Sequence, residues 1–173
     1  TIPMNVKVGG GGGGAGFLEA KYGALPIGRP GQGLANSKMA SYLDDTMFQN
    51  RIAAAAELNV NFNAEYPQKQ VRAYSDLYRD AIKLMKSEDL NAFDINKEPD
   101  SMKELYGETN FGQGCLLARR LIEHRVRYVE VTRGGWDTHD DNFNRVANNC
   151  IDIDKALSGL LADLEMRGLL KDT

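Results

Sequence analysis

Asp137 and His139 are the residues of this 173-residue chain whose types and spacing are best suited to chemistry. A carboxylate and an imidazole two positions apart in a loop can converge on one cation, and Trp136 and the glycines before it could hold that loop. Zinc, manganese and iron accept such mixed ligands, and calcium is a further candidate cation. A metal at this point could activate water or stabilise an anionic leaving group. The spacing therefore predicts a divalent-metal site, and the structural alternative is an Asp137 turn beside an exposed His139.

Several residues around this loop have both a functional and a structural interpretation. Thr138 could act as a nucleophile, with His139 as the nearest base. His124, the second histidine of the chain, lies near the end of a predicted helix, where it either favours the helix dipole or takes part in catalysis. Asp140 and Asp141 are expected to cap the helix that follows.

Two arginines and two cysteines lie on predicted helices. Arg119 and Arg120 could bind an anion, or they could form a solvated or ion-paired helix face. Cys115 and Cys150 fall on apolar helix faces, which favours free, buried thiols over a disulfide.

The elements around the loop predict the α/β fold class. Apolar residues alternate over 127–132 and indicate a strand, which runs directly into the Gly134–Gly135 hinge. Helices are expected at 113–125 before the strand and from about 140–142 to Gly168 after it, because apolar residues recur there at spacings of three and four. Ligand sites in open α/β sheets lie beyond the carboxyl ends of strands. Asp137 and His139 are in this position, because they follow the carboxyl end of the predicted strand.

The sheet that this strand needs is not evident from the sequence. One strand cannot form a sheet, and its edges would be open to pairing with another segment. The chain ends at Thr173, where the next parallel strand of a βαβ unit would begin. Either other chain segments complete the sheet, or the chain contains more strands than the one at 127–132.

The first 36 residues are expected to form a glycine-rich loop or linker. They include the run from Gly9 to Gly14, and a phosphate-binding loop would need a Lys and a Ser or Thr after it, whereas Ala15, Gly16 and Phe17 follow. A flexible connection is the favoured interpretation.

The middle of the chain is predicted to be helical. Helices are expected at 37–59, capped by Asn36 or Ser37 with Met47 and Leu58 along one side, at 68–86 and near 101–106. Their apolar faces are suited to packing against other helices or another chain.

Composition limits the classes of partner. The chain is 42% hydrophobic and 26% charged, as in a globular domain, with a formal net charge of −3. No positive field favours nucleic acid or an anionic membrane surface, and no run of 18 apolar residues predicts a transmembrane segment.

Several motifs together resemble the bacterial family called domain of unknown function 1501 (DUF1501). They are Phe93-Asp94-Ile95 with Glu98, Tyr106-Gly107, residues 111–121, residues 126–131, Gly135-Trp136-Asp137-Thr138-His139 with Asn142, Asp163-Leu164, and residues 167–173. Residues 16–92 resemble the family more loosely, through Gly16-Phe17-Leu18, Tyr22 and the helix that contains Arg51.

The resemblance implies an alkaline phosphatase- and sulfatase-like fold with a parallel sheet, of which residues 37–173 would be a partial domain. It implies metal-dependent hydrolysis of phosphate or sulfate esters, with Asp137 and His139 placed like the superfamily's metal-binding Asp and His. Family members are longer and usually begin with an export signal, so the chain would be an internal fragment of a periplasmic or otherwise exported protein. The remaining metal ligands and any nucleophile would then come from segments of the same protein or from another chain.

Two hypotheses for function stay open. In the first, the chain is part of a metal-dependent ester hydrolase whose substrate is a small anionic ester. In the second, it is a non-catalytic structural or binding subunit that packs against another chain through its amphipathic helices.

Overall fold

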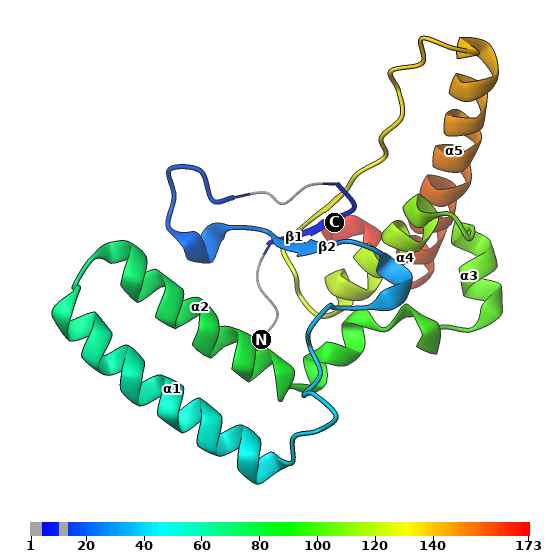
Figure 1. The fold of residues 1–173 in the computed structure, drawn as a ribbon. Coiled ribbons are helices and arrows are strands. Elements are labelled where there is room, and N and C mark those ends of the chain that lie inside the picture. The colour runs from blue at the N-terminus through cyan, green and yellow to red at the C-terminus, as the bar shows by residue number, and fades with distance from the viewer. Residues whose placement is uncertain (1–4, 11–13) are drawn as a thin grey trace.

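The computed structural model describes residues 5–10 and 14–173, and its centre is a three-stranded parallel sheet (Figure 1). The strands are β1 (Asn5–Val8), β2 (Leu25–Ile27) and β3 (Tyr128–Val131), in the order β2-β1-β3. In this register Val6 lies opposite Leu25 and Val129. Side chains alternate between the two faces of a strand, so the valines and the branched residues of β2 share one apolar face.

The expectation of a loop or linker over residues 1–36 is wrong at both N-terminal strands. β1 is the central strand of the sheet, and Val6 and Val8 are among its most buried side chains. The sequence did not predict β1, because only two apolar residues, Val6 and Val8, alternate with polar ones before the glycines begin. Residues 11–13 of the glycine run lie outside the described residues. The α/β class and the strand near 127–132 are confirmed.

Helix α4 (Asn110–Glu123) covers the apolar face of the sheet. It begins where Thr109 Oγ1 accepts a hydrogen bond from the backbone N–H of Gly112, an ordinary N-cap. Gly114 allows the close approach, because a Cβ there would lie 2.7 Å from a methyl carbon of Val131. Leu117 and Leu121 are fully buried beneath the helix.

Helices and short 3-10 turns flank α4 on two sides. On one side lie the 3-10 turns Pro30–Gln32, Glu88–Phe93 and Ile95–Lys97. On the other side α4 packs against α5 (Asn142–Met166), and α3 (Asp100–Tyr106) contacts both helices. Gly159 of α5 makes this packing possible, since a Cβ there would lie 2.7 Å from the carbonyl oxygen of Leu105.

Helices α1 (Asp45–Glu65) and α2 (Lys69–Met85) form an arm that extends away from the sheet (Figure 1). The helix expected from residue 37 begins later, because Asp44 rather than Asn36 or Ser37 accepts the capping hydrogen bond, from the N–H of Met47. None of the described side chains of α1 is buried. Met47 and Leu58, which were expected along one side of this helix, are 44% and 70% exposed.

No helix among the described residues is long and apolar enough to cross a lipid bilayer.

Candidate metal site in the loop after β3

The loop of residues 132–141 starts at the carboxyl edge of the sheet. The N–H of Thr132 donates to the carbonyl of Val8 (2.9 Å), and the N–H of Gly9 donates to the carbonyl of Ile27 (2.9 Å), so the three strand ends are hydrogen-bonded to one another. Gly9 has a φ of +73°, and a Cβ there would lie 3.3 Å from the Thr132 carbonyl oxygen. The glycine run therefore begins where the loop leaves the sheet.

Arg133 anchors the loop to helix α5. Its Nη2 donates to Asn149 Oδ1 (2.6 Å), and its Nε lies 2.9 Å from Asp152 Oδ2. Asn149 Nδ2 in turn donates to the carbonyl of Gly135 (2.9 Å), where φ is +83°. A planar guanidinium held by two side chains fixes the direction in which the chain leaves the strand.

Asp137 and His139 lie together further along this loop. Nδ1 of His139 is 2.8 Å from Oδ1 of Asp137, and the side chains are 87% and 81% exposed, respectively. Trp136 precedes them, and its Nε1–H donates to the carbonyl of Arg133 (3.0 Å), which closes a short turn. The sequence thus correctly placed the two side chains beside each other, in a loop beyond the carboxyl end of a strand.

The geometry of the pair favours one arrangement of the imidazole. In the tautomer with its proton on Nδ1, His139 donates to the Asp137 carboxylate and keeps a lone pair on Nε2. Metal-binding histidines commonly donate their second nitrogen to a carboxylate in this way. In this arrangement Asp137 could orient His139 toward a cation or could offer its second oxygen as a ligand.

The described residues supply no complete metal cage. Over residues 5–10 and 14–173, no group of three or more His, Cys, Asp or Glu side chains is placed to hold an ion. A catalytic metal usually needs three protein ligands, so Asp137 and His139 are at most part of such a site.

The other candidates of this loop have structural contacts. Thr138 Oγ1 donates to Asn142 Oδ1 at the start of α5. Asp141 occupies the N-cap position in a left-handed conformation, but its Oδ1 accepts from Asn144 Nδ2 and not from a backbone N–H, so the predicted side-chain cap is wrong. Asp140 contributes its backbone carbonyl, which accepts from Arg145 Nη1 (3.4 Å).

His124 lies at the opposite end of β3 from His139. It is the C-cap residue of α4, before the strand begins, and its Nδ1 is 3.5 Å from Asp89 Oδ1. Because the metal candidates follow the carboxyl end of the same strand, His124 does not belong to their site.

Arg119 and Arg120 are ion-paired, which was one of the alternatives that the sequence left open. Arg119 is fully buried between α4 and α5, so the prediction of a solvated face is wrong for it. Its ion-pair partners are Glu98, Glu123 and Asp163, each with an N–O distance of 2.8 Å. Arg120 pairs with the other oxygen of the same Glu98 carboxylate, and its Nε donates to the carbonyl of Ala92 (2.9 Å).

The cysteines differ from each other. Both thiols are free, but Cys115 is buried and Cys150 is exposed, so the apolar helix face predicted for Cys150 is not covered.

A comparison with protein families identifies the chain. The family described as "Protein of unknown function (DUF1501)" matches residues 2–173. The chain belongs to this family. The match includes β1 and the glycine run as well as the Trp136-to-His139 loop, and so extends further than the sequence motifs. Comparison with curated proteins and with solved structures finds no match for this DUF1501 chain.

The sequence reasoning missed the residues that anchor the loop. Asn149 and Asp152 lie three positions apart on α5 and so share a helix face. They lie on the same face as Ala156, Gly159 and Asp163, beside the apolar stripe from which the helix was predicted, so that stripe did not point to them.

Proposed function

We propose that the chain is part of a metal-dependent hydrolase of phosphate or sulfate esters, in which Asp137 and His139 belong to a divalent-metal site. The observation that carries the proposal is the 2.8 Å contact between His139 Nδ1 and Asp137 Oδ1 on an exposed loop beyond the carboxyl end of β3. Parallel α/β sheets bind ligands at this edge. The three parallel strands are consistent with the alkaline phosphatase-like sheet that we propose for the complete fold.

The donor set fits zinc, manganese or iron better than calcium. An imidazole nitrogen and a carboxylate oxygen suit these three ions, whereas calcium prefers oxygen ligands alone. His139 Nε2 and a carboxylate oxygen of Asp137 would hold the ion, and further ligands must come from outside the described residues. A divalent ion bound there would polarise the ester and lower the pKa of a bound water.

The residues of this chain would orient the site. Asp137 holds the Nδ1 proton of His139 and so directs Nε2 outward, and Arg133 keeps the loop on α5 through Asn149 and Asp152. Rigid support of this kind keeps ligands within reach of one ion.

The test is a zinc titration of the chelator-treated 173-residue chain by calorimetry. Because this chain supplies two of the ligands, we expect it to bind one zinc weakly, at a site that His139→Gln removes, and we expect Asp137→Asn to weaken zinc binding further by about tenfold to a hundredfold. His124→Gln is the matched control, because His124 also lies near an aspartate, Asp89, but at the other end of β3. Hydrolysis of p-nitrophenyl phosphate and p-nitrophenyl sulfate is then measured with the metal-loaded chain. Binding that both histidine variants weaken equally would contradict the site.

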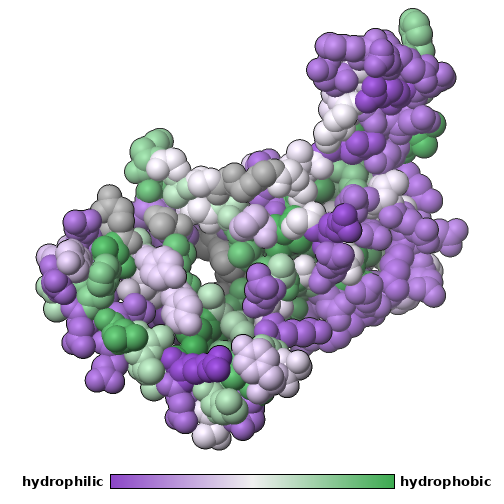
Figure 2. Space-filling view, in the orientation of Figure 1, coloured by the Kyte–Doolittle hydropathy of each residue, from purple (hydrophilic) through white to green (hydrophobic). Residues whose placement is uncertain are grey.

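The second candidate is a non-catalytic subunit that binds another chain through its helices, and the α1–α2 arm favours it. Large side chains are exposed along this arm, among them Leu58, Val60, Phe62, Tyr74 and Leu77. Figure 2 shows green, hydrophobic patches among purple ones over the arm. Such a surface is typical of interaction sites. Absence of both zinc binding and ester hydrolysis, together with a stable complex formed through α1 and α2, would favour this function over the first.

A further inference from the structure

The Asp152 carboxylate joins three parts of the fold. It lies on α5, where its Oδ2 is 2.9 Å from Nε of Arg133 in the loop after β3. Its Oδ1 accepts a hydrogen bond from the hydroxyl of Thr109, which lies directly before α4. The Asp152 side chain is only 13% exposed. One largely buried carboxylate therefore contacts both the loop of Asp137 and His139 and the start of the helix that covers the sheet.

Thr109 connects Asp152 to the backbone of α4. Its Oγ1 accepts from the N–H of Gly112 (3.1 Å), and its proton is donated to Asp152. A hydroxyl has a single proton, and an ionised carboxylate can only accept, which fixes the direction of both hydrogen bonds. The N-terminal end of a helix also favours a negative charge. Asp152 is thus bound to the first turn of α4 through the capping residue.

Arg133 depends on Asp152 for its counter-charge. Among the described residues, Asp152 is the one ion-pair partner of Arg133. The other donors of the guanidinium bind neutral groups, with Nη2 on the side-chain amide of Asn149 (2.6 Å) and Nη1 on the carbonyl of Gly134 (2.8 Å). The Arg133 side chain is 31% exposed, and a partly buried charge is costly without an opposite charge. Loss of the Asp152 charge would therefore release Arg133 towards solvent.

Arg133 in turn is connected to the metal candidates. Its carbonyl accepts from Nε1–H of Trp136 (3.0 Å), and Trp136 is adjacent to Asp137 in the chain. The contacts run without a break from the Thr109 cap, through Asp152 and Arg133, to the turn that precedes Asp137.

We propose that Asp152 is a positioning residue for the site: its charge, held between Arg133 and the Thr109 hydroxyl, ties the loop to the start of α4 and so sets where Asp137 and His139 lie. The inference rests on the proposed function for its effect on metal binding, but the position of the loop can be measured without a metal. If Asp152 only stabilised the packing of α4 against α5, its loss would lower the free energy of unfolding and leave the loop in place.

Trp136 is the single tryptophan of the chain, so tryptophan fluorescence reports on this loop alone. In Asp152→Asn the side chain keeps its shape but loses its charge, and one of its two ends becomes an N–H donor that cannot accept from Thr109 or from Arg133. We expect a higher acrylamide quenching constant and a lower anisotropy for Trp136 in the metal-free variant. We also expect its zinc affinity, measured by calorimetry, to fall about tenfold. Urea unfolding followed by circular dichroism measures stability separately.

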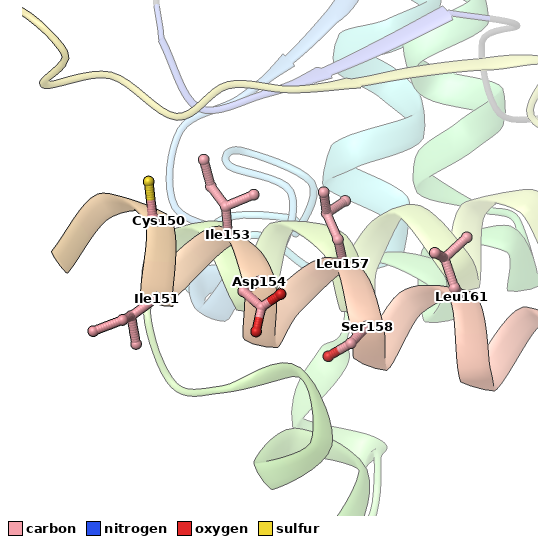
Figure 3. Close-up of a pocket in the computed structure, with 7 residues that line it drawn as sticks. All are labelled: Cys150, Ile151, Ile153, Asp154, Leu157, Ser158 and Leu161. Carbon is pink, nitrogen blue, oxygen red and sulfur yellow. The ribbon is translucent and has the colours of Figure 1, made fainter. Parts of the chain in front are cut away.

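Asp154→Asn is the matched control. Asp154 lies on the same helix two positions further on, is exposed, and lines a surface groove (Figure 3). Two positions on a helix correspond to a rotation of about 200°, so Asp154 lies on a different side of α5 from Asp152. We expect Asp154→Asn to leave both the Trp136 fluorescence and the zinc affinity at the values of the parent chain.

A pair of substitutions at Thr109 tests the link to α4 without changing Asp152. Serine and aspartate are both good N-cap residues, so both variants keep the start of the helix. Thr109→Ser retains a hydroxyl proton for Asp152, whereas the carboxylate of Thr109→Asp can only accept and repels Asp152. We expect Thr109→Asp to raise the quenching of Trp136 as Asp152→Asn does, and Thr109→Ser to match the parent.

The outcomes separate this inference from the proposed function. Unchanged quenching of Trp136 in Asp152→Asn, or the same quenching in Thr109→Asp as in Thr109→Ser, would overturn the positioning role even if the parent chain binds zinc at His139. An equal effect of Asp154→Asn would overturn it as well. A parent chain that binds no zinc would contradict the proposed function, and the fluorescence of the metal-free variants would still decide the role of Asp152.

Discussion

The guanidinium of Arg119 and the carboxylate of Asp163 form an ion pair inside the protein, with Nε 2.8 Å from Oδ2 and side chains only 1% and 2% exposed. Tyr106 O–H donates to the same carboxylate oxygen (2.9 Å), and Arg167 Nε lies 2.6 Å from the other. These contacts join α3, α4 and the end of α5. They hold in place the helix on which the loop of Asp137 and His139 is anchored.

Arg119→Met should destabilise the chain strongly. It leaves the Asp163 charge buried with fewer partners, and breaking a buried pair costs about 3–5 kcal/mol. Urea unfolding measures the change in the free energy of unfolding. Arg79→Met is the control, because Arg79 and its partner Asp76 are both exposed and such pairs contribute about 1 kcal/mol or less. Equal effects of the two substitutions would show that the buried pair contributes no more than a surface one.

Stability should fall in acid through Glu98. Burial alone would raise the pKa of this carboxyl, but the hydrogen bonds and charges of Arg119 and Arg120 hold the pKa below its ordinary value. The unfolded chain therefore takes up the proton at a higher pH than the folded chain, so stability is present above the ordinary glutamate pKa of about 4.3 and is lost as the pH falls below it. Unfolding of Glu98→Gln measured from pH 3 to 7 should show a shallower pH dependence than the parent. If the free energy of unfolding of Glu98→Gln changed with pH as steeply as that of the parent, Glu98 would not be a source of the acid sensitivity.

Most of the helical elements were predictable from the sequence, and two of the three strands were not. In helices α2, α4 and α5, apolar residues recur at spacings of three and four, and in strand β3 they alternate with other residues. These repeats are long enough to be recognised in the sequence. β2 contains a proline among three residues, and β1 is recognisable only through its pairing with β3. Their formation depends on contacts far apart in sequence, which local patterns do not carry.

The position of Asp137 and His139 in one loop was predictable from the sequence, but the contacts that support this loop were not. The Trp136-to-His139 motif placed the two side chains in a loop after a strand, and the structure brings them together. The contact of Arg133 with Asn149 and Asp152, and that of Arg119 with Asp163, join residues 16 to 44 positions apart. The residues around a single acidic side chain on a helix do not show whether its charge is exposed to solvent or is buried against a distant partner.

Gly159→Ala should destabilise the contact between α3 and α5. Alanine usually favours a helix over glycine by about 1 kcal/mol, but its Cβ would here lie 2.7 Å from the Leu105 carbonyl oxygen. Overpacking of this kind costs about 1–3 kcal/mol. In Gly28→Ala, the control, the added Cβ meets no described atom within 4 Å, and thermal unfolding should change little. A more stable Gly159→Ala would contradict the close approach of the two elements.

The two cysteines should react at very different rates. At pH 8 a maleimide should modify exposed Cys150 quickly and buried Cys115 only after unfolding, because burial, with a smaller effect of the Asp152 charge, raises the pKa of the Cys115 thiol to about 12. The unfolded thiol ionises near its ordinary pKa of about 8.5, so this group also makes folding less favourable as the pH rises from there towards 12. Mass spectrometry of the singly labelled chain identifies the site. Rapid labelling of both residues in the folded chain would show that Cys115 is accessible.

The most direct test of the metal proposal is a long-range ¹H–¹⁵N spectrum of the two histidines during zinc addition. We predict that the Nε2 resonance of His139 shifts to the position of a metal-bound nitrogen while Nδ1 keeps its proton, held by Asp137. The His124 resonances should stay unchanged at the same zinc concentrations. A His139 ring that does not respond to zinc, or one that responds no more than His124, would contradict the assignment of Asp137 and His139 to a metal site.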